Sequence, residues 1–169
     1  MTIKDLEPKI VWKYFHEITQ VPRPSKKEGK IIKYIEDVAA KNKIEIKKDK
    51  VGNLLLFKPA TKGFEKFPTI ILQAHLDMVC EKNSKVKFDF DKDPIKTVVD
   101  GEWLCADGTT LGADNGIGVA AALAVVTSKD IKHGPIECLF TVDEETGLTG
   151  AKALKKGFLT GNILLNLDS

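Results

Sequence analysis

A histidine and an aspartate stand two residues apart at the end of an apolar run in this sequence. Residues 69–77 read TIILQAHLD, which places His75 and Asp77 where the apolar residues end. Residues two apart on a strand point to the same side, so the imidazole and the carboxylate would lie next to each other. An imidazole is a good ligand for a transition metal, and a neighbouring carboxylate can share that metal or orient the ring. A single His-x-Asp motif is more often a surface contact than a metal site. Its role therefore depends on partner residues elsewhere in the chain.

Further carboxylates stand beside other predicted elements. They are Asp114, in a glycine-rich stretch before a helix, Glu144 and Glu145, after an apolar run, and Asp168, after the last apolar run. Ligand sites of open α/β sheets lie outside the carboxyl ends of the strands, and this is where we expect these side chains. Three strands that each deliver a histidine or a carboxylate are more than composition alone predicts.

A two-metal hydrolytic site is the chemistry that these residue types fit. Two divalent cations about 3.5–4 Å apart need a bridging carboxylate and further histidine or carboxylate ligands. Asp114 is the candidate for the bridge, because a loop residue can direct both of its oxygens at once. His75 and Asp168 could complete the site of one metal, and Glu145 could bind the other.

The remaining acidic residues fit other roles. Glu144 is free to act as a base for a water molecule whose pKa the metals lower toward about 7. Asp77 would hold the imidazole of His75 in one tautomer from outside the ligand set. An alternative without metal is that Asp114 and Asn115 only cap the following helix, although capping and metal bridging do not exclude each other.

Hydrophobic periodicity predicts the elements that must position these side chains. Four helices are predicted. The first covers residues 8–19, and the second follows Ser25, which can cap it, and continues through Val38. The other two cover residues 117–126 and 149–156. The predicted strands cover residues 43–48, 53–58, 69–74, 85–90, 96–106, 136–142 and 163–167. A tight turn between the first two strands predicts a hairpin.

Strands and helices alternate from residue 70 onward, which favours an α/β fold. The near-continuous apolar runs at 69–73, 136–142 and 163–167 are typical of strands in a sheet that is covered on both faces. We therefore expect a layered α/β architecture with a mixed, mostly parallel sheet flanked by helices, in which the early hairpin supplies antiparallel strands.

Composition indicates an ordinary globular protein and argues against several partners. The chain has 169 residues, enough for one domain, and 26 basic against 24 acidic residues give a formal net charge of +2. This balance argues against nucleic acid and against an anionic membrane. We find no signal peptide and no run long enough to span a membrane. An odd number of cysteines without metal-type spacing fits a reducing compartment, so we expect a cytoplasmic protein.

Two other chemistries fit the sequence less well. Cys80 stands close to the candidate site, but no unassigned histidine is placed to activate it as a nucleophile, so a packed thiol is favoured. The glycine-rich stretch 108–118 lacks the lysine and hydroxyl residue of a phosphate-binding loop, and the dinucleotide fingerprint is absent too.

Four longer motifs carry a family resemblance. They are AHLDMV at 74–79, GADNGIGVA at 112–120, TVDEETGLTGA at 141–151 and LLNLDS at 164–169. Together with PRPSKKEGKI at 22–31, these motifs resemble the zinc-dependent aminoacyl-histidine dipeptidases, and the resemblance runs from about residue 8 to the last residue. Members of that family are cytosolic bacterial enzymes, carnosinase-like in activity, that cleave Xaa-His and related dipeptides. The resemblance implies a zinc-exopeptidase-like fold.

The resemblance also implies a role for each candidate residue. His75, Asp114, Glu145 and Asp168 match the ligands of two Zn²⁺ ions with Asp114 as the bridge, Asp77 matches the carboxylate that supports the histidine, and Glu144 matches the general base. Other divalent ions such as Co²⁺ or Mn²⁺ would also suit this set. The family often has a cis peptide bond after the bridging aspartate, so we expect one between Asp114 and Asn115.

Family members are much longer than this chain, which ends directly after a strand-like run. The resemblance implies that residues 1–169 are the N-terminal portion of a di-zinc peptidase catalytic domain, and that the lid and dimerisation domain and a C-terminal catalytic segment are absent. The absent segment would supply a last histidine ligand, so we expect this fragment to be inactive alone and the full-length protein to be a homodimer that binds dipeptides.

Two alternatives remain open at this point. The chain could be a non-catalytic fragment, or a metal- or peptide-binding module that keeps the fold without the reaction. It could also belong to a related deacylase or carboxypeptidase, because such enzymes use nearly the same ligands. Aspartate at position 168, where those relatives more often have glutamate, favours aminopeptidase or dipeptidase chemistry.

Overall fold

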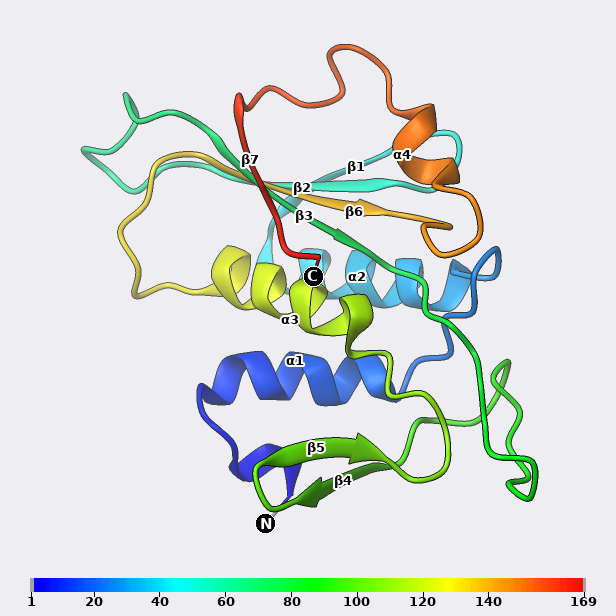
Figure 1. The fold of residues 1–169 in the computed structure, drawn as a ribbon. Coiled ribbons are helices and arrows are strands. Elements are labelled where there is room, and N and C mark those ends of the chain that lie inside the picture. The colour runs from blue at the N-terminus through cyan, green and yellow to red at the C-terminus, as the bar shows by residue number, and fades with distance from the viewer. Residues whose placement is uncertain (1, 169) are drawn as a thin grey trace.

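A five-stranded mixed sheet is the centre of the protein, as the computed structural model of residues 2–168 shows (Figure 1). Its strands are β1 (Glu45–Lys48), β2 (Leu54–Lys58), β3 (Ile70–His75), β6 (Ile136–Thr141) and β7 (Ile163–Asn166), in the order β1-β2-β6-β3-β7. Strand β2 runs antiparallel to β1 and β6, and β3 runs parallel to β6 and β7. All strands except β2 therefore share one direction, which confirms the expected mostly parallel sheet and the early hairpin.

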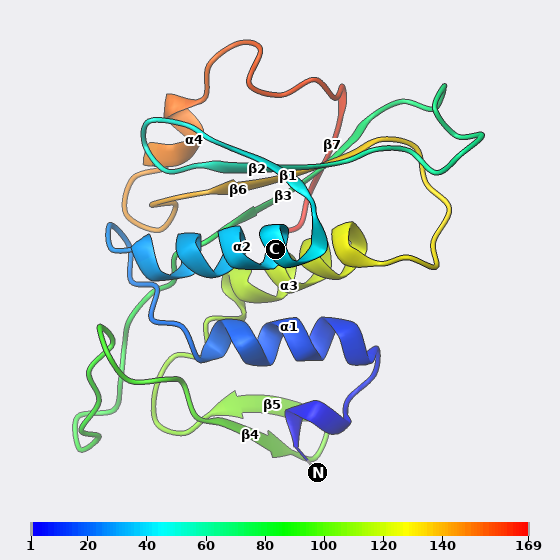
Figure 2. The same ribbon diagram turned by 180° about the vertical axis from the view of Figure 1, so that it is seen from behind.

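Three helices lie on one side of this sheet, in two layers. They are α1 (Lys9–Thr19), α2 (Gly29–Asn42) and α3 (Ala113–Thr127). Helices α2 and α3 lie directly against the sheet, and α1 packs against α3 on the side away from the strands (Figures 1 and 2). The alanines and glycines of α3 let it lie close to its neighbours, and the core between these layers is closed by Phe15, Ile35, Leu123 and Phe140.

The opposite face of the sheet is covered more thinly. The short helix α4 (Thr149–Ala153) and the segment after it lie over β2, β3 and β6, where Leu154, Phe158 and Leu159 pack on a small apolar cluster. Strand β6 is buried along its whole length, as its apolar run predicts. Strand β7 is not, because it is the edge of the sheet: Ile163, Leu164 and Leu165 are 43%, 50% and 47% exposed. The prediction that this run is covered on both faces is therefore wrong.

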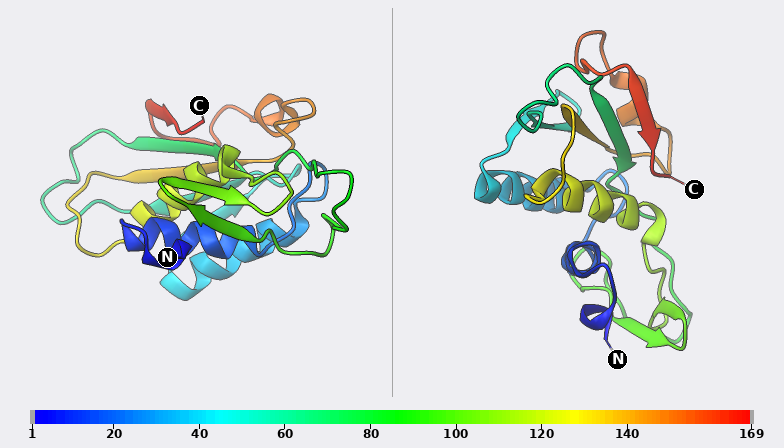
Figure 3. Two further views of the ribbon diagram at one scale, coloured as in Figure 1. Left: turned by 60° about the horizontal axis from the view of Figure 1, so that its bottom comes forward. Right: turned by 90° about the vertical axis from the view of Figure 1, so that its left-hand side faces the viewer.

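A separate hairpin lies beyond α1, on the side away from the sheet (Figure 3). It consists of β4 (Thr97–Asp100) and β5 (Trp103–Ala106), and the 3₁₀ helix η1 (Ile3–Asp5) lies beside it. The single strand predicted for 96–106 is thus two strands, because Gly101 adopts a positive φ and reverses the chain.

Other elements also differ from the prediction, among them α3, which begins at Ala113 and not at residue 117. The segment 85–90 is not a strand, because no strand of the described residues lies beside it to pair with. The chain turns at its end, where Asp89 accepts the N–H of Asp91. Helix α2 begins at Gly29, and the Ser25 hydroxyl donates to Asp77 instead of capping the helix. Helix α4 ends at residue 153, earlier than predicted. Among the described residues, no helix combines the length and the apolar character that crossing a bilayer requires.

Candidate metal centre

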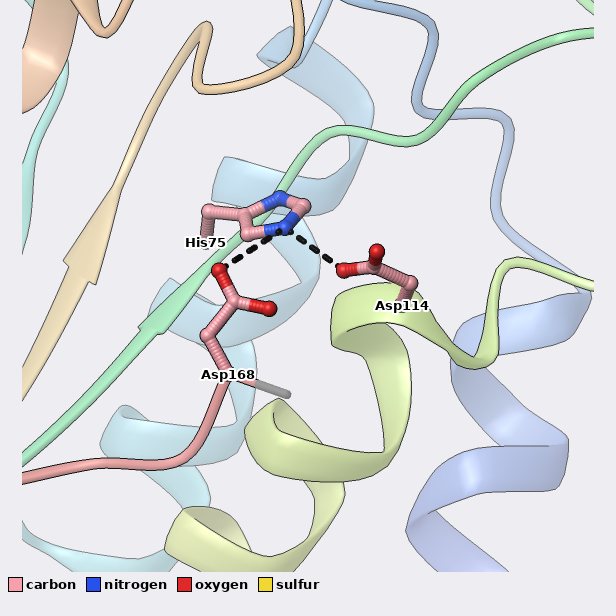
Figure 4. Close-up of side chains that lie close together, drawn as sticks. All are labelled: His75, Asp114 and Asp168. Atoms are coloured by element: carbon pink, nitrogen blue, oxygen red, sulfur yellow. Dashed lines mark hydrogen bonds and ion pairs between the residues drawn. The ribbon is translucent and has the colours of Figure 1, made fainter.

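His75 is the last residue of β3, and its imidazole is only 1% exposed. Its Nε2 atom lies 3.0 Å from Oδ1 of Asp114 and 3.7 Å from Oδ2 of Asp168 (Figure 4). Asp114 lies at the start of α3, and Asp168 follows β7. Three elements that are far apart in the sequence thus direct one nitrogen and two carboxylates at a common point.

Asp77 is fully buried and lies on the other side of the same ring. Its Oδ1 atom is 3.3 Å from Nδ1 of His75 and accepts the N–H of Glu144 at 3.0 Å. Its Oδ2 atom accepts the N–H of Glu145 at 3.2 Å and the hydroxyl of Ser25 at 2.8 Å. Burial alone would raise the pKa of Asp77, but these hydrogen bonds lower it to about 2, so the group is a carboxylate at neutral pH.

The two glutamates after β6 lie close to the same imidazole. One ligand atom each of His75, Glu144 and Glu145 lies within 4.8 Å of the others, and the same holds for His75, Asp114 and Asp168. Burial, followed by the charge of Asp114, raises the pKa of Glu145. All six residues predicted from the sequence therefore converge at the carboxyl ends of β3, β6 and β7.

The backbone around Asp114 explains how this residue reaches His75. Gly112 has a φ of 70°, and Asp114 and Asn115 have non-helical dihedral angles at the start of α3. The peptide bond between Asp114 and Asn115 is cis, which confirms the prediction. The side chain of Asn115 donates to the carbonyl of Leu167 at 3.0 Å and to Asp168 at 3.2 Å. It links α3 to the segment after β7 instead of only capping the helix.

The loop that carries both glutamates has its own buried support. Asp143, which precedes them, has a φ of 50° and accepts hydrogen bonds from the hydroxyls of Thr146 and Thr149. Its N–H donates to the buried carboxylate of Glu28 at 2.9 Å. Sequence reasoning missed Glu28, because a glutamate before a helix usually lies on the surface and no spacing rule connects it to residue 143.

The donor set fits a divalent transition metal. Burial lowers the pKa of His75, but the carboxylates of Asp77 and Asp114 outweigh it and raise the pKa to about 9. An imidazole nitrogen that faces several carboxylates is thus a place that favours positive charge. One nitrogen with carboxylate oxygens is a set that Zn²⁺ accepts, and Co²⁺ or Mn²⁺ also binds such donors. The thiol of Cys80 is half-buried and directed at the carbonyl of Met78, and burial raises its pKa.

Arg23 is a further residue of this region that sequence reasoning missed. Its guanidinium is buried beneath the candidate site and donates to the carbonyls of Leu76, Asp77 and Gly112. One signal in the sequence could have found it, because Arg23 is the only arginine in a lysine-rich chain.

Comparison with known proteins gives a consistent result. The model of peptidase family M20/M25/M40 matches residues 71–166. The cytosol non-specific dipeptidase of Escherichia coli is 47% identical over 167 residues, which are 99% of this chain and 34% of that protein. The crystal structure of an aminoacylhistidine dipeptidase from Vibrio alginolyticus matches with a TM-score of 0.98 and 50% identity, over 100% of this chain and 34% of that one. An aminopeptidase structure from Bacillus cereus matches with a TM-score of 0.79 and 32% identity, over 95% of this chain and 43% of that one.

The chain spans about a third of the length of the first two of these relatives. The resemblance to aminoacyl-histidine dipeptidases is confirmed by the identity over nearly all of these residues and by the shared fold. The family model covers more than half of the chain, including β3, α3, β6 and β7. On this ground, the chain belongs to peptidase family M20/M25/M40.

Proposed function

We propose that the full-length protein hydrolyses dipeptides, those of the Xaa-His type among them, at a two-zinc site. Family membership supports peptide hydrolysis, and two of the similar proteins are named as dipeptidases. The observation that carries the proposal is the buried imidazole of His75, whose Nε2 atom faces Asp114 at 3.0 Å and Asp168 at 3.7 Å. Carboxylates that crowd one imidazole repel each other unless positive charge lies between them, and a bound divalent cation would supply it.

Four residues would hold the metals in this proposal. Asp114 would bridge both ions, His75 and Asp168 would complete one site, and Glu145 would bind the other. Zn²⁺ ions bound there would polarise the scissile carbonyl and make water a better nucleophile, and Co²⁺ or Mn²⁺ could replace them.

Glu144 would act as the general base, and Asp77 would position the imidazole of His75. Glu144 would accept the proton of the attacking water and pass it to the leaving amine. Asp77 would keep the proton of His75 on Nδ1, where the two atoms lie 3.3 Å apart, and so leave Nε2 as the ligand atom. The hydrogen bonds from the N–H groups of Glu144 and Glu145 to Asp77 would fix the base relative to the ligand.

We also propose that these 169 residues are the N-terminal part of the catalytic domain and are inactive alone. The chain spans about a third of its relatives, and the side chain of Asp114 is 61% exposed. The metal site is thus open to water on one side, where a lid domain and a further catalytic segment with the last histidine ligand would close it. The Escherichia coli relative is named a cytosol dipeptidase, which supports a cytoplasmic location, and the resemblance supports a homodimer.

The test compares the full-length protein with its Glu144→Ala variant and with Glu102→Ala, which removes an exposed glutamate in the turn between β4 and β5. We expect cleavage of Xaa-His dipeptides that stops when a chelator removes the metal. Glu144→Ala should lower kcat by about 10²–10⁴-fold, because a general base contributes that much, while Zn²⁺ stays bound. Glu102→Ala should behave as the unchanged protein. Cleavage of N-acyl amino acids in place of dipeptides would favour the deacylase alternative, and full activity of Glu144→Ala would refute the assigned base.

A further inference from the structure

Arg23 is a chemical exception in this chain. The sequence holds 26 lysine and arginine residues, and Arg23 is the only arginine among them. It stands between Pro22 and Pro24, and it is only 2% exposed. Lysine and arginine carry the same charge, but only a guanidinium offers several N–H donors in one rigid plane. The position therefore uses the shape of the donor group as well as its charge.

The guanidinium joins the two segments that deliver the central ligands. Its Nη1 atom donates to the carbonyls of Leu76 at 3.0 Å and Asp77 at 2.8 Å, directly after β3. Its Nη2 atom donates to the carbonyl of Gly112, two residues before Asp114. The main chain of Arg23 contributes as well, because its carbonyl accepts the N–H of Met78 at 3.2 Å.

The glycine-rich stretch before α3 provides the space for this side chain. A Cβ atom at Gly112 would lie 2.5 Å from Nη2 of Arg23, and a Cβ atom at Gly116 would lie 2.7 Å from it. Both distances are too short for a side chain. The glycines that could be taken for a phosphate-binding loop therefore accommodate an arginine of the same chain.

The charge of Arg23 matches its surroundings. Burial lowers the pKa of the guanidinium to about 10, and the charges of Asp77, Asp114 and Glu145 act in the opposite direction. The group stays protonated at neutral pH. Its positive charge offsets part of the repulsion between these carboxylates, so that they can lie close together before any metal arrives.

We propose that Arg23 is a positioning residue of the candidate metal centre, whose guanidinium holds the segment after β3 and the segment before α3 at the separation that His75 and Asp114 require. The effect on metal binding rests on the proposed function. The link between the two segments does not, because it needs only the hydrogen bonds described above.

The test uses Arg23→Lys, Arg23→Met and a matched control variant, all made in the full-length protein. Arg23→Lys keeps the charge and loses the planar donors, and Arg23→Met removes both. The control is Lys58→Met, because Lys58 also ties main-chain carbonyls of α3 and its flank, donating to Val125 at 3.0 Å and Ser128 at 2.5 Å, away from the metal site. Each variant is measured for Co²⁺ affinity, for the visible spectrum of bound Co²⁺ and for the free energy of unfolding.

We expect Arg23→Lys to weaken Co²⁺ binding by about 10–100-fold, as loss of an outer support of a metal site does, and to change the Co²⁺ spectrum. Lys58→Met should leave affinity and spectrum unchanged even where it lowers stability. Wild-type Co²⁺ affinity and spectrum in Arg23→Lys would overturn the proposal. If Arg23→Met does not fold, the result for Arg23→Lys alone tests the proposal.

Binding by the unchanged full-length protein separates the two proposals. If that protein binds no Co²⁺, the proposed metal site is wrong, and amide hydrogen exchange then decides the role of Arg23. Faster exchange at Met78 and Gly116 in Arg23→Lys, with α2 unaffected, would support the link between the segments. Unchanged exchange at both amides would overturn it.

Discussion

Asp77 connects the histidine on β3 to the loop that carries both glutamates. Each of its oxygens has more than one partner: Oδ1 faces His75 and accepts from Glu144, and Oδ2 accepts from Glu145 and Ser25. A change at this one carboxylate therefore affects the orientation of the imidazole and the position of two other site residues together. Supports of this kind tune metal ligands as strongly as many direct contacts do.

Asp77→Asn tests this role. The amide keeps the shape of the side chain, but one of its two polar ends becomes a donor that faces other donors, so the loop and the imidazole both lose support. We expect Zn²⁺ affinity to fall by about 10–100-fold in a competition titration with a chromophoric chelator. Asp91→Asn is the control, because Asp91 pairs with Lys27 on the surface at 2.6 Å. Equal Zn²⁺ affinities of Asp77→Asn and Asp91→Asn would contradict the role.

The three thiols should react at different rates with a disulfide reagent. Cys105 is exposed, Cys80 is half-buried, and Cys138 is buried in β6 with its pKa raised by burial to about 12. Only the thiolate reacts, so we expect Cys105 to react first, Cys80 more slowly and Cys138 only on unfolding. Mass spectrometry of the labelled peptides would show the order, and labelling of Cys138 in the native state would contradict the packing of β6.

At the scale of elements, local pattern predicted most of what the structure shows. Helix α1, the β1–β2 hairpin and strands β3 and β6 follow from apolar periodicity, because each buries one side or all of a short segment. The misses have physical causes that periodicity does not encode. Segment 85–90 alternates like a strand but has no strand to pair with, and Ser25 bonds to a residue 52 positions away.

The connection into β7 depends on one buried carboxylate. Glu137 in β6 accepts the N–H groups of Thr160 and Gly161 at 3.0 and 3.2 Å and the hydroxyl of Thr160 at 2.5 Å. A Cβ atom at Gly161 would lie 2.7 Å from Ile71, so this crossover lies tightly on the sheet.

Glu137→Ala should loosen this crossover. The N–H groups of Thr160 and Gly161 would lose their acceptor, at a cost on the order of 2 kcal/mol or more in the free energy of unfolding. Urea denaturation measures the change, and Glu45→Ala on the exposed side of β1 is the control. Equal stability of the two variants would show that the crossover is held by other contacts.

At the scale of the whole molecule, the sequence predicted the layered α/β fold and the meeting of six side chains at one edge of the sheet. This was possible because parallel strands bring their carboxyl ends to the same edge of the sheet. Side chains that follow those strands therefore meet there. Arg23 and the link from Asn115 to the segment after β7 escaped prediction. Their hydrogen bonds span 53 to 89 and 52 to 53 residues of sequence and depend on how three segments pack together.

The exposed edge of the sheet gives a prediction for the isolated chain. Strand β7 pairs only with β3 among the described residues, and Ile163, Leu164 and Leu165 are all exposed. An apolar edge strand is a template for pairing with another chain. We expect the mass from light scattering to rise with concentration and Leu164→Lys to suppress this rise. Val51→Lys, at another exposed apolar residue, should not suppress it. A monomeric mass at every concentration would contradict the expectation.

Chemical modification of the single buried arginine can measure local opening of the protein around it. A dicarbonyl reagent selective for guanidinium groups has a single target in this chain, and that target is shielded in the folded state. Adduct formation would therefore proceed only as fast as the segments around Leu76 and Gly112 separate. Comparing its rate with that of the denatured chain would give the free energy of this local opening without any introduced label. A divalent ion bound by the neighbouring carboxylates should slow the reaction. The rate at which the adduct mass appears would therefore report both local opening and metal binding.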